Sequence, residues 1–158
     1  MSYRAGRHFL QIPGPTNVPE RVLRAMSKPT IDHRGPEFQA LGGELLVAVR
    51  DVFRTERPVV IFPASGSGAW EASLVNCLSP GDRVLMAETG HFATLWKEIA
   101  ERLGLQVEWI PGDWRRGVAP QVVESTLAAD RAHAIKAVCV VHNETSTGVV
   151  SPIQRIRQ

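Results

Sequence analysis

Short continuous runs of apolar residues alternate along this chain with longer segments whose apolar residues recur every three or four positions. The runs that predict strands are 59–62, 83–87, 106–110 and 135–141, and the intervening helices are expected at about 68–78, 91–103 and 120–129. Continuous apolar runs are typical of strands covered on both faces. Because strands and helices alternate, the sequence predicts an α/β fold with a mostly parallel sheet and helices on both faces.

The segments before the first apolar run have a different character. Residues 8–19 are rich in proline, which favours an extended N-terminal arm or loop over 1–19. A short helix is expected at about 20–27 and a longer one at about 36–54, where Phe38, Leu41 and Leu45 follow helical spacing. Another helix is expected to begin after Ser151-Pro152. We therefore expect residues 20–158 to form one large but incomplete ligand-binding domain.

Composition excludes some classes of function. The net charge is +2, from 18 basic and 16 acidic side chains, and the basic residues are scattered, which argues against a nucleic-acid or polybasic membrane binder. No stretch approaches the ~18 apolar residues of a transmembrane helix. The two cysteines, Cys77 and Cys139, lie in apolar surroundings and are expected to be buried free thiols of a cytoplasmic protein.

Ligands of such sheets bind outside the carboxyl ends of the strands, so the loops that follow the strands matter most. The first is 63–69, in which Ser65, Ser67 and two glycines precede a helix. Glycines permit a close backbone approach, and a helix start offers free N–H groups, so this loop suits a phosphate. A plain turn with a serine cap is the alternative. The loop is neither a P-loop nor a complete dinucleotide fingerprint, because Glu71 stands in place of the third glycine.

Two further loops carry candidate residues. In 88–92, Phe92 could stack on a flat ligand or belong to the apolar stripe of its own helix. In 142–148, several hydrogen-bonding side chains follow a strand; they could serve a ligand or cap the following turn. His142 and Glu144 have the spacing of a zinc deaminase, but the Pro-Cys-x-x-Cys that such a site needs is missing. We expect no metal site.

Taken in order, five segments give the chain a family resemblance. They are Pro13–Asn17, Ser65–Ala72, Leu78–Asp82, Gly90–Phe92 and His142–Gly148. Together they resemble the class V aminotransferases, which are fold type I enzymes dependent on pyridoxal 5′-phosphate. The stretches 30–38 and 112–117 are most similar to the serine–glyoxylate branch, with alanine–glyoxylate aminotransferases also close. The resemblance implies the N-terminal part of the large domain and transfer of an amino group from serine or alanine to glyoxylate.

The resemblance also implies roles for matching positions. Ser67, Gly68 and Ala69 would hold the cofactor phosphate, Phe92 would stack on the pyridine ring, and Thr145 would bond its hydroxyl. The substrate would meet Gly14 and His33, and His33 and Arg34 would reach the neighbouring subunit's site in a homodimer with shared active sites. Partners would be small amino acids and 2-oxo acids, with no nucleic acid and no membrane.

The family's Schiff-base lysine has no match here. Lys28, Lys97 and Lys136 all fall at other positions, so we expect no catalytic residue in this chain and no activity from it alone. The pyridinium-pairing aspartate and the carboxylate-binding arginine are expected beyond residue 158 as well. Alternatives are a cysteine desulfurase-like class V enzyme, a non-catalytic phosphate- or nucleotide-binding module, and a nicotinamide oxidoreductase.

Overall fold

The computed structural model describes residue 10 and residues 12–158 of the chain. It divides into two compact units, one ending at Ile61 and the other spanning Phe62–Gln158. Each unit is described by itself. The expected division between an arm over 1–19 and a large domain over 20–158 stays a prediction.

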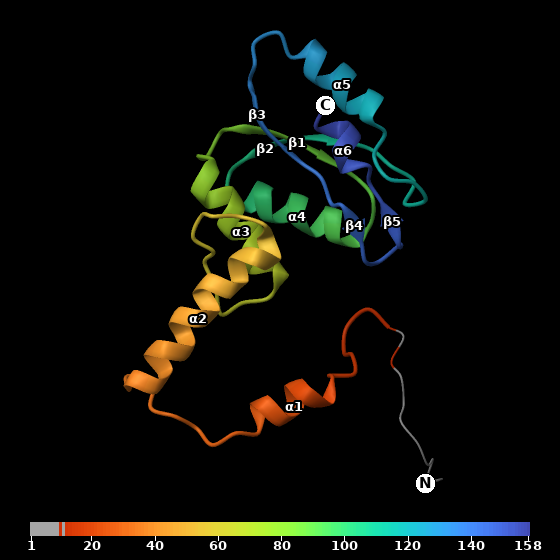
Figure 1. The fold of residues 1–158 in the computed structure, drawn as a ribbon. Helices are drawn as coiled ribbons and strands as arrows, with labels where there is room; N and C mark the ends of the chain where they lie inside the picture. The colour runs from red at the N-terminus through yellow and green to blue at the C-terminus, as the bar shows by residue number, and fades with distance from the viewer. Residues whose placement is uncertain (1–9, 11) are drawn as a thin grey trace, which may run out of the picture. The chain divides into compact units, whose positions relative to one another are not determined.

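The unit from Phe62 onward is built on a parallel sheet (Figure 1). Its strands are β1 (Arg83–Ala87), β2 (Gln106–Ile110) and β3 (Ile135–Cys139), in the order β2-β1-β3. Both neighbours run parallel to β1 and align with it from Arg83 onward, with one irregularity against β3 after that residue. The helices are α3 (Gly66–Cys77), α4 (His91–Arg102), α5 (Pro120–Ala129) and α6 (Ile153–Ile156). The parallel α/β prediction is confirmed.

Strand β1 supplies the centre of two apolar layers, because successive side chains of a strand point to opposite faces. Val84 and Met86 pack in one cluster with residues of α3 and α4. Leu85 and Ala87 pack in the other with residues of α5 and α6. Helices therefore cover both faces of the sheet, as the sequence predicts (Figure 1). This arrangement leaves the carboxyl ends of the strands, and the loops that follow them, at one edge.

The polar segment after β3 forms a small hairpin. Strands β4 (Asn143–Glu144) and β5 (Val149–Val150) pair antiparallel, and residues 145–148 make the turn between them. Gly148 has a φ of +75°, a left-handed conformation that costs glycine little. The hairpin thus gives the polar loop a fixed shape next to the sheet.

Three expectations were wrong. Residues 59–62 form no strand, and Val60 and Ile61 are 68% and 65% exposed. An isolated apolar run cannot become a strand unless a neighbour pairs its N–H and C=O groups, and no described strand does so. The run 135–141, which is the longest of the apolar runs, was expected to be the most buried strand, but it forms the edge strand β3, and β1 is the most buried of the described strands. Cys77 is exposed on α3, whereas Cys139 is buried as expected.

The unit that ends at Ile61 contains helices α1 (Glu20–Met26) and α2 (Pro36–Phe53). Helix α2 begins with proline at its first turn and ends at Arg54, whose left-handed backbone closes the last turn. Its apolar stripe forms as predicted, but Phe38, Leu41 and Leu45 are exposed among the described residues. None of the described helices has the length and hydropathy required to cross a membrane.

Candidate functional site

The first candidate element is the start of α3, which the structure leaves open to an anion. Ser65 occupies the N-cap position but makes no side-chain capping bond, and the first turn contains no acidic residue. Ser67 and Ala69 are exposed. A Cβ on Gly68 would lie 2.5 Å from the Cβ of Ala64, so the turn closes too tightly for any larger residue. The Gly68 N–H already donates to the Ser65 carbonyl at 3.0 Å, so an exposed hydroxyl and the positive end of a helix dipole are the features that suit a phosphate.

The second element is the start of α4, where an aromatic cluster joins the two helices. The Phe92 ring is half-buried and lies edge-on to Trp70 of α3, with 6.2 Å between ring centroids. Trp70 in turn stacks on Trp96 at 5.4 Å. Phe92 therefore contacts α3, the helix whose start is the candidate phosphate site. Just before it, Thr89 is buried, and its Oγ1 has no hydrogen-bond partner in the described part of the chain.

The hairpin after β3 reaches α4 through Glu144, a residue with 0% exposure. Its Oε1 and Oε2 accept hydrogen bonds from the backbone N–H groups of Phe92 at 3.3 Å and Ala93 at 3.0 Å. The Ser146 N–H and Oγ–H also donate to Oε1, at 3.1 and 2.7 Å. The Ser146 Oγ accepts a bond from the His91 N–H at 3.0 Å. A carboxylate far along the sequence thus caps α4.

Glu144 stays ionised despite its burial. Burial raises the pKa of the carboxyl, but the hydrogen bonds from Ser146, Ala93 and Phe92 outweigh it, so the pKa falls below the ordinary value of 4.5. The folded form therefore binds the proton more weakly than the unfolded chain does. The stabilisation is fully present above pH 4.5 and is lost as the pH falls through the lower, folded pKa.

We predict that Glu144→Gln flattens the acid side of the stability curve. The thermal unfolding midpoint of the unchanged protein should fall as the pH drops below about 4.5, the ordinary pKa of a glutamate carboxyl. The unfolding midpoint of the variant should be lower at neutral pH and should change less as the pH falls. Thermal unfolding followed by circular dichroism at several pH values measures both curves. Parallel curves for the two proteins would contradict the assignment. Asp130, whose pKa is also lowered, chiefly by the N–H of Ile135, accounts for a separate part of the acid dependence.

Thr145 and Thr147, both on the hairpin turn, differ in their exposure and in their hydrogen bonds. Thr145 is exposed, so its hydroxyl is accessible to a ligand. Thr147 is half-buried and donates from Oγ1 to the carbonyl of Thr89 at 3.1 Å. Of this pair, only Thr145, which the sequence singled out, is exposed to a ligand; the other ties the hairpin to the loop after β1.

A further contact between loops could not be predicted from the sequence. Glu88, at the end of β1, accepts bonds from the Trp114 Nε1–H at 2.9 Å and the Gly112 N–H at 3.3 Å. This carboxylate joins the loop after β1 to the loop after β2. Residues so far apart in the sequence show no shared pattern, so only the fold could reveal the pair. The capping role of Glu144 was missed for the same reason.

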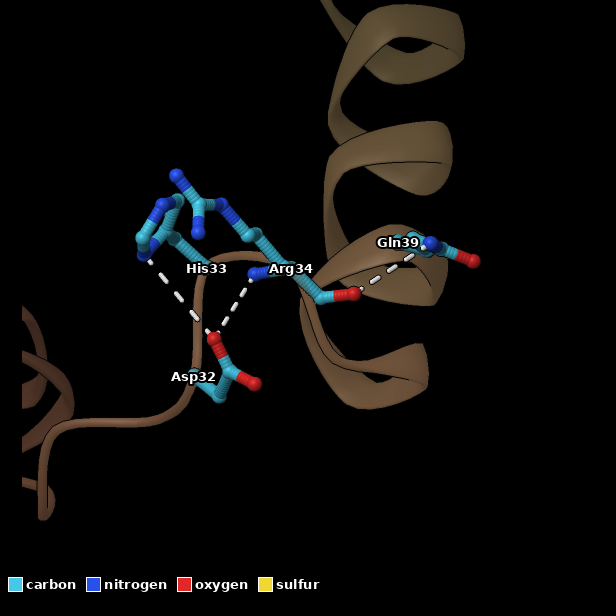
Figure 2. A network of polar contacts seen from close by, with 4 residues as sticks. All are labelled: Asp32, His33, Arg34 and Gln39. Atoms are coloured by element: carbon cyan, nitrogen blue, oxygen red, sulfur yellow. Dashed lines mark hydrogen bonds and ion pairs between the residues drawn. The ribbon is translucent and has the colours of Figure 1, made fainter.

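The remaining predicted positions, Gly14 and His33, lie in the other unit and are both exposed. His33 and Arg34 form the turn before α2, and Asp32 organises it (Figure 2). Asp32 Oδ1 accepts the Arg34 N–H at 2.9 Å and lies 3.9 Å from His33 Nδ1. The Arg34 carbonyl accepts a bond from Gln39 Nε2 at 3.4 Å. The imidazole and guanidinium groups project from a fixed turn, but their role toward substrate stays a prediction.

No group of three or more potential metal ligands occurs among the described residues. Burial raises the pKa of the Cys139 thiol to about 11, so it stays protonated and inert at neutral pH.

Comparison with known proteins gives these loops a context. The family model "Aminotransferase class-V" matches residues 8–158. The chain is 48% identical to a serine–glyoxylate aminotransferase of Methylorubrum extorquens and 45% identical to one of Arabidopsis thaliana. Each match covers 98% of this chain and 39% of the relative, so the chain spans about two fifths of their length. Among solved structures, an aspartate aminotransferase of Thermus thermophilus matches with a TM-score of 0.84 and 30% identity, over 94% of this chain and 41% of that one.

Proposed function

This chain belongs to the class V aminotransferase family, and from that membership we propose that the full-length protein transfers an amino group from serine to glyoxylate. The proposed cofactor is pyridoxal 5′-phosphate. When bound, this cofactor supplies the electron-withdrawing ring that allows an amino group to leave one carbon and join another. The protein's part is to bind, orient and shield it.

One observation supports the proposal: the first turns of α3 and the start of α4 are linked by an aromatic contact, and the start of α4 is linked to the hairpin after β3 by hydrogen bonds. Trp70, one turn after Ser67, meets Phe92, and the Phe92 N–H meets Glu144, which precedes Thr145. The uncapped start of α3 fits a phosphate, whereas a buried carboxylate already occupies the start of α4. An anion is therefore expected at α3 and not at α4, because like charges repel.

Each candidate residue would then have its own role toward the cofactor or the substrate. Ser67, Gly68 and Ala69 would hold the phosphate at the start of α3, where the Ser67 hydroxyl and the positive end of the helix dipole favour an anion. Phe92 would lie against the ring, and the Thr145 hydroxyl would bond the ring's oxygen. Gly14 would line the substrate pocket through its backbone, and His33 with Arg34 would serve a site shared between two subunits of a homodimer.

Neither Lys97 nor Lys136, the two lysines of the unit that begins at Phe62, is placed to link the cofactor. The Lys97 ammonium pairs with Glu101 and lies 5.7 Å from the centre of the Trp109 ring, on the side of α4 that packs on the sheet. Lys136 donates to the carbonyl of His133 at the amino end of β3. Lys28 lies in the other unit, near α1. We therefore propose that the linking lysine belongs to a part of the protein outside these residues.

A cytoplasmic location accompanies this proposal. The supporting observation is that Cys77 and Cys139 are both free thiols, one of them exposed. Unpaired thiols of this kind are typical of a reducing compartment.

The test uses the full-length protein with pyridoxal phosphate. Borohydride reduction should attach one cofactor covalently, and serine should be the preferred amino donor to glyoxylate over alanine and aspartate. Because one hydroxyl separates serine from alanine, kcat/KM for serine should be about tenfold higher or more. A clear preference for alanine or aspartate would overturn the donor. Sulfur release from cysteine would favour the desulfurase alternative, and binding of a nucleotide without any covalent cofactor would favour a binding module.

A further inference from the structure

Glu144 is the most completely buried carboxylate of the described residues, and its hydrogen bonds come from neutral groups alone. Its four donors are the backbone N–H groups of Phe92, Ala93 and Ser146 and the Ser146 hydroxyl. No described salt bridge includes it. A buried charge without an ionic partner is costly unless all its bonds are made. Its neighbours are therefore held closely to the carboxylate.

These donors belong to the two segments that carry the proposed ring contacts. One donor is the backbone of Phe92 itself, at the start of α4. Another is the backbone of Ser146, the residue after Thr145 on the hairpin turn. Thr145 lies between Glu144 and Ser146, so the hydrogen bond from the Ser146 N–H to the Glu144 carboxylate restricts the backbone on both sides of Thr145. One side chain thus fixes the position of Phe92 relative to Thr145.

The surroundings leave little freedom for this arrangement. A Cβ on Gly90 would lie 2.5 Å from the Glu144 Cγ and 2.6 Å from the Ser146 Oγ, so the carboxylate packs directly against the backbone of the loop after β1. The Thr147 hydroxyl adds a bond to the Thr89 carbonyl of the same loop. The hairpin and the start of α4 are held as one piece.

We propose that Glu144 is a positioning residue, whose carboxylate sets Phe92 and Thr145 at the spacing that a flat, hydroxyl-bearing ring requires. This inference rests on the proposed function, because it takes the ring to be that of pyridoxal phosphate. A cap that serves the fold alone would stabilise α4 and leave cofactor binding unchanged. In the positioning role, loss of the Glu144 carboxylate would also weaken binding of the cofactor ring.

The test compares Glu144→Gln with Asp130→Asn in the full-length protein. Gln keeps the size of the side chain but replaces one accepting oxygen with a donor that faces N–H groups. Asp130 is the matched control: its carboxylate also accepts a backbone N–H, that of Ile135 at 2.8 Å, but at the amino end of β3, away from the loops. Both variants replace a charged acceptor with a neutral amide and so weaken structural hydrogen bonds, and only Glu144→Gln disturbs the ring contacts.

Three measurements are made on each protein. They are amide hydrogen exchange at Phe92 and Ala93 without cofactor, the dissociation constant for pyridoxal phosphate, and the circular dichroism band of the bound cofactor. In Glu144→Gln, exchange should quicken, the band should change, and the dissociation constant should rise about tenfold or more. Asp130→Asn should lower the unfolding midpoint and change none of the three. Ser146→Ala, a milder change that removes one donor to the carboxylate together with the acceptor of the His91 N–H, should raise the dissociation constant about threefold.

The outcomes separate the inference from the function on which it rests. Faster exchange in Glu144→Gln with an unchanged dissociation constant and band would show a cap for the fold alone and overturn the positioning role. If Glu144→Gln does not fold, the Ser146→Ala variant tests the positioning role instead. A Ser146→Ala protein that binds the cofactor as tightly as the unchanged protein would overturn that role. Absence of pyridoxal phosphate binding by the unchanged protein would overturn the proposed function, and this inference with it.

Discussion

Gly90→Ala is expected to release the cofactor and to loosen the start of α4. The added methyl group would lie 2.5 Å from the Glu144 Cγ and 2.6 Å from the Ser146 Oγ, distances that no real contact of a Cβ tolerates. The buried carboxylate would have to move, and the N–H groups of Phe92 and Ala93 would lose their acceptor. Overpacking of this kind costs about 2 kcal/mol, which lowers the unfolding midpoint by roughly 4–8 °C. The dissociation constant for pyridoxal phosphate should rise more than about tenfold.

Thermal unfolding and a cofactor titration of the full-length protein measure both effects. Gly43→Ala is the control, since a Cβ at Gly43 of α2 would meet nothing within 4 Å. Alanine favours a helix interior over glycine by about 1 kcal/mol, so the control should keep or slightly raise the midpoint. A Gly90→Ala protein with the midpoint and affinity of the unchanged protein would contradict the packing described for Glu144.

Leu85→Ala is expected to cause the largest loss of stability. Leu85 has 0% exposure at the centre of β1 and packs with Val118 and Val123 on the α5 side of the sheet. Removing its side chain leaves a cavity between two layers that cannot close without moving a strand. The free energy of unfolding should fall by about 3 kcal/mol.

Urea unfolding of the full-length protein measures the loss, and Leu127→Ala supplies the comparison. Leu127 is 40% exposed on α5, so the same truncation removes far less buried surface. Its cost should be under about 1 kcal/mol. Equal losses at the two positions would mean that β1 is not the centre of the core.

Much of the fold could be predicted because its signals are local. The runs 83–87 and 106–110 have the bounds of β1 and β2, and the helix expected at 120–129 is α5. The run at 59–62 failed although its residues are as apolar as those of β1. A strand exists only where a neighbour accepts its hydrogen bonds, and the described chain provides none there.

Some residues of the candidate site could be predicted from the sequence, and others could not. Ser67, Phe92 and Thr145 were chosen from loops expected at strand ends. Phe92 and Thr145 follow β1 and β3, whereas Ser67 follows residues 59–62, which form no strand. The roles of all three remain proposals. Glu144 and Glu88 were not recognised as the residues that join the loops. Each bonds to groups more than twenty residues away, and such partners leave no periodicity in the sequence.

The sequence by itself determined that the chain forms a parallel α/β sheet, where most of its helices and strands lie, and which loops carry glycines, hydroxyls and an aromatic ring. These properties follow from local steric preference and from the spacing of apolar residues. Only the tertiary structure decided that Glu144 lies buried against Gly90 and caps a distant helix. A buried carboxylate takes its position from the donors that the fold brings to it, and those donors meet only when the chain is folded.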